Sequence, residues 1–182
     1  MAEPNGILAA AQAASKKGPP PVHLWNPPYC GEMDLRIARD GTWFHEGAPI
    51  GRAPLVKLFA GILKLEEGRF YLVTPVEKLG ITVEDAPFIA VDFTVSGSGR
   101  NQDVTFTTNV GDDVPLGPDN PLRMGDGAPY VMVRRGLEAR VDRKSFYRLI
   151  DLGEAEGDWF GLWSRGHFFP VIPVADLQDS SL

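Results

Sequence analysis

The chain has 182 residues, of which 43% are hydrophobic and 23% are charged, a composition typical of soluble globular proteins. Its net charge of −6 argues against duplex binding, because such proteins carry a basic face that displaces phosphate counterions. The single cysteine, Cys30, excludes an internal disulfide and fits a reducing cytoplasm. No apolar run reaches the roughly 18 residues of a membrane span. We therefore expect a cytoplasmic protein that neither binds nucleic acid nor crosses a membrane.

Both ends of the chain are expected to be tails. Residues 1–21 contain a short Ala-rich stretch, but so short a helix is only marginally stable alone in water. A Gly-Pro-Pro-Pro run follows and prevents the helix from continuing. We expect a flexible tail or a peripheral helix over residues 1–21, and a short tail over residues 176–182.

The next elements predict a hairpin followed by a helix. A strand over residues 34–38 turns at Arg39-Asp40-Gly41 and returns over residues 42–45, with glycine supplying the positive φ of the turn. Pro54 suits the first turn of a helix, and apolar residues then recur at helical spacing. We expect a helix over residues 53–65.

A strand end near the middle of the chain gathers polar residues. Residues 70–74 form a strong strand candidate, which Pro75 ends because proline has no N–H to donate. Residues 81–84 alternate apolar and polar side chains, as a half-buried strand does. We expect the functional site near this strand end.

The second half predicts more hairpins. Residues 88–95 form a strand with Ile89, Val91, Phe93 and Val95 on one face, and residues 104–108 return beside it. Residues 111–127 are rich in Gly, Pro and Asp and are expected to be a long surface loop.

The last elements are two hairpins around a helix. The first hairpin covers residues 130–141 and turns at Arg135-Gly136, and Asp142 is a suitable N-cap for a helix over residues 143–151. The second covers residues 158–172 and turns over Ser164-Arg165-Gly166.

The order hairpin, helix, glycine, strand occurs in both halves, at residues 35–69 and again at residues 130–158. A repeated order of elements is typical of a duplicated fold. We predict an α+β protein of two similar units, residues 22–87 and 88–175, each a bent antiparallel sheet with one helix.

Several blocks resemble the bacterial domain-of-unknown-function family 1285. The blocks are GRFYLVTPVEK (68–78), ITVEDAPF (81–88), FTTN (106–109), VRRGLEAR (133–140) and WSRG (163–166). They extend over residues 22–173, and TPVEK followed by VEDAPF is specific to that family.

The resemblance implies two related α+β units, the second loosely similar to a pleckstrin-homology-type barrel. It also implies a ligand site between the units, for a nucleotide-like molecule, and a role in signalling with a protein partner. No activity comes with the resemblance, and likeness to a lipid-binding barrel would not carry lipid binding with it.

Three arginines concentrate positive charge in one hairpin of this acidic protein: Arg134, Arg135 and Arg140. The fork of a guanidinium group matches the oxygens of a phosphate or carboxylate. We expect Arg134 and Arg140 to face a small anionic ligand. The alternative is that these arginines pair with nearby Asp and Glu side chains.

Other candidate ligand contacts are short polar groups and one aromatic ring. Thr74, Lys78, Asn109 and Ser164 would line the site, and Trp163 would stack on a flat ring. The alternative is that the polar groups cap turns and that Trp163 packs in the core.

An enzyme is the second hypothesis, with Glu77 or Asp85 as the general base of a hydrolase, and a protein-interaction module is the third. His23, His45 and His167 are scattered without metal-ligand spacing, so no metal site and no cofactor are expected. The sequence favours a non-catalytic ligand-sensing protein.

Overall fold

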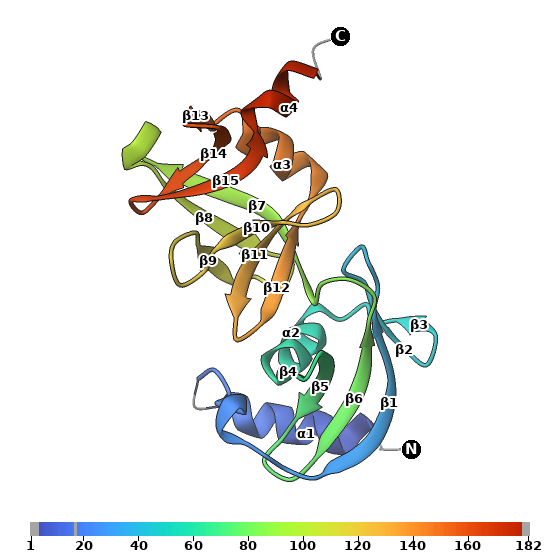
Figure 1. Cartoon of the computed structure of the whole chain (residues 1–182). Coiled ribbons are helices and arrows are strands. Elements are labelled where there is room, and N and C mark those ends of the chain that lie inside the picture. Colours follow the sequence, from blue (N-terminus) through green and yellow to red (C-terminus); the bar gives the residue numbers. More distant parts are fainter. Residues whose placement is uncertain (1–3, 17, 180–182) are drawn as a thin grey trace. The chain divides into compact units, whose positions relative to one another are not determined.

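The computed structural model describes residues 4–16 and 18–179, and it divides between Pro87 and Phe88 into two compact units (Figure 1). We call the part before this point unit 1 and the part after it unit 2.

Unit 1 is built on a six-stranded sheet with the order β3-β2-β1-β6-β5-β4. All neighbouring strands are antiparallel except the central pair, β1 and β6, which run in parallel side by side in Figure 1. The strands are β1 (Tyr29–Ile37), β2 (Trp43–His45), β3 (Ala48–Pro49), β4 (Leu63–Glu66), β5 (Arg69–Val73) and β6 (Lys78–Val83).

Unit 2 repeats this arrangement in the order β10-β11-β12-β7-β8-β9. Here too the central pair, β12 and β7, is parallel and the other neighbours are antiparallel. The strands are β7 (Phe88–Ser96), β8 (Asp103–Thr108), β9 (Asp113–Pro115), β10 (Leu122–Met124), β11 (Pro129–Arg134) and β12 (Leu137–Val141).

In both sheets the first three strands are placed in order from the centre of the sheet to one edge, and the last three in order from the other edge back to the centre. The last strand therefore lies beside the first. This confirms two similar α+β units. The sheets are mixed and not wholly antiparallel, because the returning strand meets the first one in parallel. The repeat relates β1–β6 to β7–β12, a different correspondence from the hairpin-and-helix match that the sequence suggested.

Helices complete unit 1. Helix α1 (Pro4–Ser15) packs on α2 (Ala53–Gly61), and Ile7 and Ala11 of α1 are fully buried. A short 3₁₀ turn, η1 (Val22–Leu24), follows α1. Of the two expectations for residues 1–21, a flexible tail or a peripheral helix, the described residues form the helix, since tertiary burial stabilises a helix that would be marginal alone.

Unit 2 carries a further layer after its six-stranded sheet. It comprises α3 (Arg143–Ile150), the three-stranded sheet β13 (Glu154–Glu156), β14 (Trp159–Ser164) and β15 (His167–Pro173), and α4 (Val174–Asp179). Asp142 caps α3 as predicted, because its Oδ1 accepts a hydrogen bond from the Ser145 N–H at 2.8 Å. The part of the predicted C-terminal tail that is described, residues 176–179, belongs to α4, and the rest lies outside the described residues.

Four of the two-residue hairpins in the described part of the chain have a glycine as their second residue, and they fix the registers of their strands. The loops are Glu46-Gly47, Glu67-Gly68, Arg135-Gly136 and Arg165-Gly166, and φ is positive at every one of these positions. Two successive positive φ angles define the type I′ turn, whose twist matches that of the flanking strands.

Three element predictions need correction. Helix α2 ends at Gly61 and not at residue 65, because Leu63 already pairs with Leu72 in the sheet. Residues 111–127 are not one long loop, since they contain β9, β10 and a bridge between Gly117 and Asn120.

The third correction concerns strand β7. A bulge between Ala90 and Asp92 interrupts the alternation, so that Val91 is 41% exposed while Phe93 is buried. An extra residue in one strand shifts every later side chain to the other face.

Candidate functional site

Four neighbouring strands of unit 1 carry one row of directly paired residues on the face opposite the core. Glu32 of β1 is opposite Gly80 of β6, Gly80 is opposite Tyr71 of β5, and Tyr71 is opposite Lys64 of β4. Directly paired residues point to the same face of a sheet. The adjoining residues Leu63, Leu72 and Leu79 are buried and point the other way.

The carboxylate of Glu32 lies on the backbone of Gly80. A methyl group at Gly80 would overlap this carboxylate and would lie 2.6 Å from its carbon, Cδ. The Tyr29 hydroxyl donates a hydrogen bond to Glu32 at 2.8 Å, and Arg69 pairs with the same oxygen. Hydrogen bonds from Arg69 and then Tyr29 lower the pKa of Glu32, whereas the bond to Glu32 raises the pKa of Tyr29.

Two cations flank the ring of Tyr71. The guanidinium of Arg69 lies 5.4 Å from the ring centre and the Lys78 ammonium 4.8 Å from it, within the range of cation–π attraction. Lys78 also pairs with Glu66 at 2.8 Å, which raises the pKa of Lys78. Lys78, a predicted ligand contact, thus belongs to a network of paired charges.

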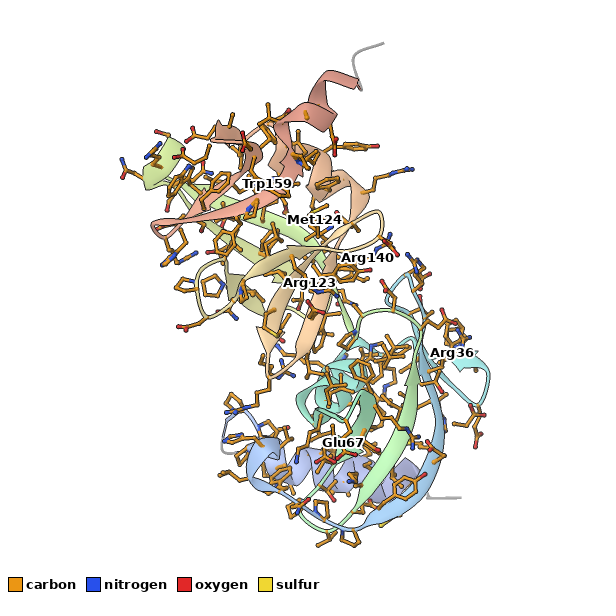
Figure 2. All side chains as sticks on the ribbon, viewed as in Figure 1. Arg36, Glu67, Arg123, Met124, Arg140 and Trp159 are labelled. Carbon is orange, nitrogen blue, oxygen red and sulfur yellow. The ribbon has the colours of Figure 1, made fainter. Side chains whose placement is uncertain are left out.

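Unit 2 carries a corresponding row. Ile89 of β7 is opposite Arg140 of β12, Arg140 is opposite Tyr130 of β11, and Tyr130 is opposite Arg123 of β10. Figure 2 labels Arg123 and Arg140 on this sheet (Figure 2). Two arginines therefore flank one tyrosine on a single face.

Arg123 is held in place from several sides. Its guanidinium lies 4.5 Å from the centre of the Tyr130 ring and forms two hydrogen bonds, at 2.7 and 2.8 Å, with the Glu138 carboxylate. Gly125 leaves room for this stack, since a methyl group there would lie 2.6 Å from the Tyr130 ring. The ring and the acid together fix the direction in which Arg123 points.

The two rows run over matching strands in the same order, so their residues can be compared strand by strand. Tyr71 matches Tyr130, and Lys64 matches Arg123. The other two positions differ: Gly80 matches Arg140, and Glu32 matches Ile89. We call these the unit 1 row and the unit 2 row.

The structure does not bring Arg134 and Arg140 to the same face of the sheet. A bulge between Met132 and Arg134 places Arg134 opposite Leu137, whereas Arg140 is opposite Tyr130. Arg134 accordingly lies over the buried ring of Phe88, at 5.3 Å, and pairs with Asp112 at 3.4 Å.

Two of the predicted polar contacts make local hydrogen bonds. The Thr74 hydroxyl oxygen accepts bonds from the N–H groups of Val76 and Glu77, at 3.3 and 3.1 Å, and so caps its own turn. The Asn109 side-chain oxygen accepts a bond from the Ile89 N–H at 3.0 Å and ties β8 to β7.

Trp163 and Ser164 lie next to each other on β14 but face different surroundings. The fully buried Ser164 hydroxyl accepts a bond from the Val104 N–H at 3.0 Å and donates to the Leu116 carbonyl at 2.6 Å. Trp163 is half-buried, with its ring centre 5.4 Å from that of Phe168 and 5.0 Å from the Arg100 guanidinium.

One arrangement recurs in both units: a cation that lies over an aromatic ring and pairs with an acid. Such contacts anchor surface side chains to the fold, and they favour the ion-pairing alternative for Arg134. The cations that follow this pattern are Arg36, Arg69, Lys78, Arg100, Arg123, Arg134 and Arg148.

The described carboxylates whose pKa is shifted all titrate below their usual range. Cations or N–H groups donate to Glu32, Asp40, Glu66, Glu84 and Asp92 and lower each pKa. Such carboxylates stay ionised near neutral pH and are weak bases there. Within the described residues, no three potential metal ligands gather in one place, and no helix is long and apolar enough to span a membrane.

Sequence reasoning missed most of both rows, namely Glu32, Lys64, Tyr71, Gly80, Arg123 and Tyr130. A signal did exist, because Tyr71-Leu72-Val73 and Tyr130-Val131-Met132 are the same tyrosine-apolar-apolar pattern. What the sequence lacked was the pairing of β1 with β6 and of β12 with β7, which joins segments distant in the chain.

Comparisons with known proteins agree with this duplicated architecture. Residues 20–86 match the N-terminal domain, and residues 87–171 the C-terminal domain, of a family described as a protein of unknown function, DUF1285. No curated protein matches the chain.

Two crystal structures are similar. A DUF1285 family protein from Silicibacter pomeroyi DSS-3 is 62% identical, with a TM-score of 0.89 over 95% of this chain and 98% of that one. A DUF1285 family protein from Shewanella baltica OS155 is 29% identical, with a TM-score of 0.54 over 64% of this chain and 90% of that one.

Proposed function

The chain belongs to the DUF1285 family of unknown function, and we propose that it is a non-catalytic protein that binds a small anionic ligand at the unit 2 row. The observation that carries the proposal is the register that sets Arg123, Tyr130 and Arg140 side by side on one face. Of the residues predicted from the sequence, Arg140 is central to this proposal.

The chemistry of the row suits an anion. Guanidinium groups offer two parallel N–H donors to the oxygens of a carboxylate or phosphate. Strands β10 and β12 are two strand spacings apart, or about 10 Å, with Tyr130 of β11 between Arg123 and Arg140 in the register. Arg123 is engaged by Glu138, and we assign the main contact with the ligand to Arg140.

The absence of catalysis is part of the proposal, and the state of the carboxylates supports it. A general base works best with a pKa near the working pH. The acids near the unit 1 row, Glu32 and Glu66, have lowered pKa values because cations hydrogen-bond to them. No observation favours Glu77 or Asp85 as a base, so the hydrolase hypothesis gains no support.

The remaining predicted contacts have other roles within their units. Thr74, Asn109 and Ser164 stabilise the backbone by hydrogen bonds, and Arg134 and Lys78 pair with acids. Their contact with a ligand, the stacking by Trp163, a ligand position between the units and a signalling partner stay predictions.

A thermal-shift screen tests the proposal directly. The purified chain is screened against nucleotides, dinucleotides, phosphorylated metabolites and small organic acids. A ligand that binds only the folded state adds about 2.7 kcal/mol at 100 times its Kd and raises the melting temperature by a few degrees.

Paired variants assign the site. Arg140→Gln should weaken a hit by about 1.5–3 kcal/mol, the contribution of a hydrogen bond to a charged group. Arg36→Gln is the control from unit 1, because it removes the same charge from an arginine that lies over a ring, Phe44, and pairs with an acid, Glu84, away from the unit 2 row. A flat screen, or a hit that survives Arg140→Gln, would contradict the proposal.

A further inference from the structure

We propose that one face of the three-stranded sheet β13-β14-β15 binds an arginine-rich segment of a protein partner. This sheet is separate from the six-stranded sheet that carries the unit 2 row, so the inference goes beyond the anion site proposed above. It rests on an exposed tryptophan, Trp159, and on the acids of the short edge strand beside it.

The strand register places aromatic and acidic side chains on one face of this sheet. Glu156 of β13 is opposite Trp159 of β14, and Glu154 is opposite Gly161. Trp163 lies two residues beyond Gly161 along β14, so it points to the same side. The residues that alternate with them at this end of β14 are buried and point the other way, namely Leu162 and Ser164. We call the side that carries the two tryptophans and the two acids the aromatic face.

Trp159 is the most accessible of the four tryptophans in the chain. It is 44% exposed, whereas Trp43 is buried and Trp25 and Trp163 are half-buried. Figure 2 labels Trp159 in unit 2 (Figure 2). Tryptophan gains more than most residues from burial and is enriched among the residues that dominate protein interfaces. An exposed tryptophan on a sheet therefore indicates a docking surface.

The aromatic face already holds one guanidinium group. Arg100 lies 5.0 Å from the centre of the Trp163 ring and pairs with Glu156 at 2.7 Å. This is the arrangement that recurs in both units, in which a cation lies over a ring and pairs with an acid.

Trp159 and Glu154 provide the ring and the acid of a second such arrangement. They are diagonal neighbours across the β13–β14 pair, and such neighbours lie about 7–8 Å apart, within reach of one bound cation. Among the described residues, no cation lies over the Trp159 ring and none pairs with Glu154. The missing component is a cation, which a partner can supply.

The charges around Trp159 fit a cationic partner. Residues 151–159 contain no Lys or Arg but have four acids, namely Asp151, Glu154, Glu156 and Asp158. These carboxylates repel nucleic acids and anionic lipids, and the electron-rich face of the indole ring attracts a cation.

The geometry favours arginine, and more than one. A guanidinium group stacks on a ring and meets a carboxylate through two parallel hydrogen bonds, as a lysine ammonium cannot. An exposed ion pair contributes at most about 1 kcal/mol, so a single small cation would bind too weakly. We therefore assign the aromatic face to a peptide segment that carries several arginines.

Titration of the whole ¹⁵N-labelled chain with a hexa-arginine peptide tests the inference. The indole N–H resonance of Trp159, identified by its loss in Trp159→Leu, reports binding at the aromatic face in NMR spectra. We expect this resonance to shift. Hexa-arginine should bind about threefold more tightly than hexalysine at equal ionic strength, because only arginine stacks and forms the bidentate pair.

Variants locate the binding, with affinities measured by the fluorescence anisotropy of labelled hexa-arginine. Trp159→Leu keeps an apolar side chain but removes the aromatic ring, and it should weaken binding by about fivefold. Trp159→Phe keeps a ring and should weaken binding less. Glu154→Gln should weaken it by about threefold. Asp34→Asn is the charge control, because it removes one charge from an exposed acid of β1 in unit 1, and it should leave the affinity nearly unchanged.

Three results would overturn the inference. The Trp159 resonance does not move at saturation, or Trp159→Leu binds hexa-arginine as tightly as the unmodified chain does. Alternatively, Asp34→Asn and Glu154→Gln weaken binding equally, since the peptide would then follow the net charge of −6 and not the aromatic face. Equal affinity for hexalysine would overturn the assignment to arginine. If Trp159→Leu does not fold, the comparison of Glu154→Gln with Asp34→Asn decides.

Discussion

The two sheets differ in the charges on the faces that carry the rows, although the sheets follow the same path. In unit 1 the acids in and beside the row around Tyr71, Glu32 and Glu66, are each paired with cations of the same unit. In unit 2 the row around Tyr130 contains two arginines and an isoleucine where unit 1 has a lysine, a glycine and a glutamate.

The difference shows which parts of a duplicated sheet are free to change. The core positions beside the two tyrosines stay apolar in both units, since Leu72 and Val131 are both fully buried. The positions that alternate with them lie on the other face of each sheet, where Glu32 is exposed in unit 1 but Tyr130 and Ile89 are only 6% and 9% exposed in unit 2. The residues of this face therefore differ between the units, while the strand order, the parallel central pair and the apolar core remain.

The largest expected effect comes from the shared core. Leu72→Ala should lower the free energy of unfolding of unit 1 by about 2–5 kcal/mol, because it removes buried methyl groups and leaves a cavity. Val131→Ala should cost less in unit 2, since a smaller side chain is lost. Hydrogen exchange of the β5 and β11 amides measures both losses.

Leu24→Ala is the control for this core comparison, because Leu24 is 73% exposed and its truncation should change little. Equal exchange rates in Leu72→Ala and the unmodified chain would contradict the assignment of Leu72 to the core.

A smaller loss is expected at the turns that set the registers. Gly68→Ala should destabilise unit 1 by about 1–2 kcal/mol, because φ is +78° there and an alanine in this region is strained. Space is not the cause, since nothing lies within 4 Å of the added methyl group. Denaturant unfolding measures the change.

Gly51→Ala is the matched control for this turn. It also has open space around the added methyl group, but its φ is not in the strained region. We expect no loss there, and equal losses in Gly51→Ala and Gly68→Ala would show that the turn geometry is not responsible.

A still smaller effect is expected where the unit 1 row holds its carboxylate. Gly80→Ala places a methyl group where the Glu32 carboxylate lies, so this flexible side chain must move away. The pKa of Glu32 should then rise toward the ordinary value of about 4.3, because the bonds from Arg69 and Tyr29 are lost. Carboxyl ¹³C NMR across the acid range measures it, and an unchanged pKa would contradict the contact.

The smallest effect is the acid dependence of stability. The folded-state pKa of Glu32 lies below its unfolded value, so its contribution is complete above the unfolded pKa and is lost as pH falls through the lowered one. Glu32→Gln should therefore destabilise unit 1 slightly at pH 7 and not at all at the acid end. A loss that is the same at pH 7 and in acid would mean that charge is not involved.

Local patterns in the sequence predicted the elements well, because their causes are local. Arg135-Gly136 and Arg165-Gly166 form the predicted turns, and Asp142 caps the predicted helix. The errors arose where tertiary pairing overrides local preference. Helix α2 stops early because Leu63 enters the sheet, and a bulge in β7 exposes Val91.

The candidate site was harder to predict, since it depends on which strands are neighbours. Arg140 was identified because it lies with two other arginines in one hairpin of an acidic chain. Its pairing with Tyr130 and Ile89 joins three strands, and the bulge before Arg134 turns that side chain to the other face. Neither feature leaves a pattern in the residues themselves.

The most direct test of the comparison removes the carboxylate from unit 1. Glu32→Ala leaves Arg69, Tyr29 and Gly80 without the acid that they surround. Because Arg69 and Tyr29 hold a carboxylate in the unit 1 row, free acetate should bind in place of the missing side chain. Acetate should then raise the melting temperature of Glu32→Ala more than chloride does at equal ionic strength. The account would be contradicted if acetate and chloride changed the melting temperature of Glu32→Ala equally, as they should for the unmodified chain.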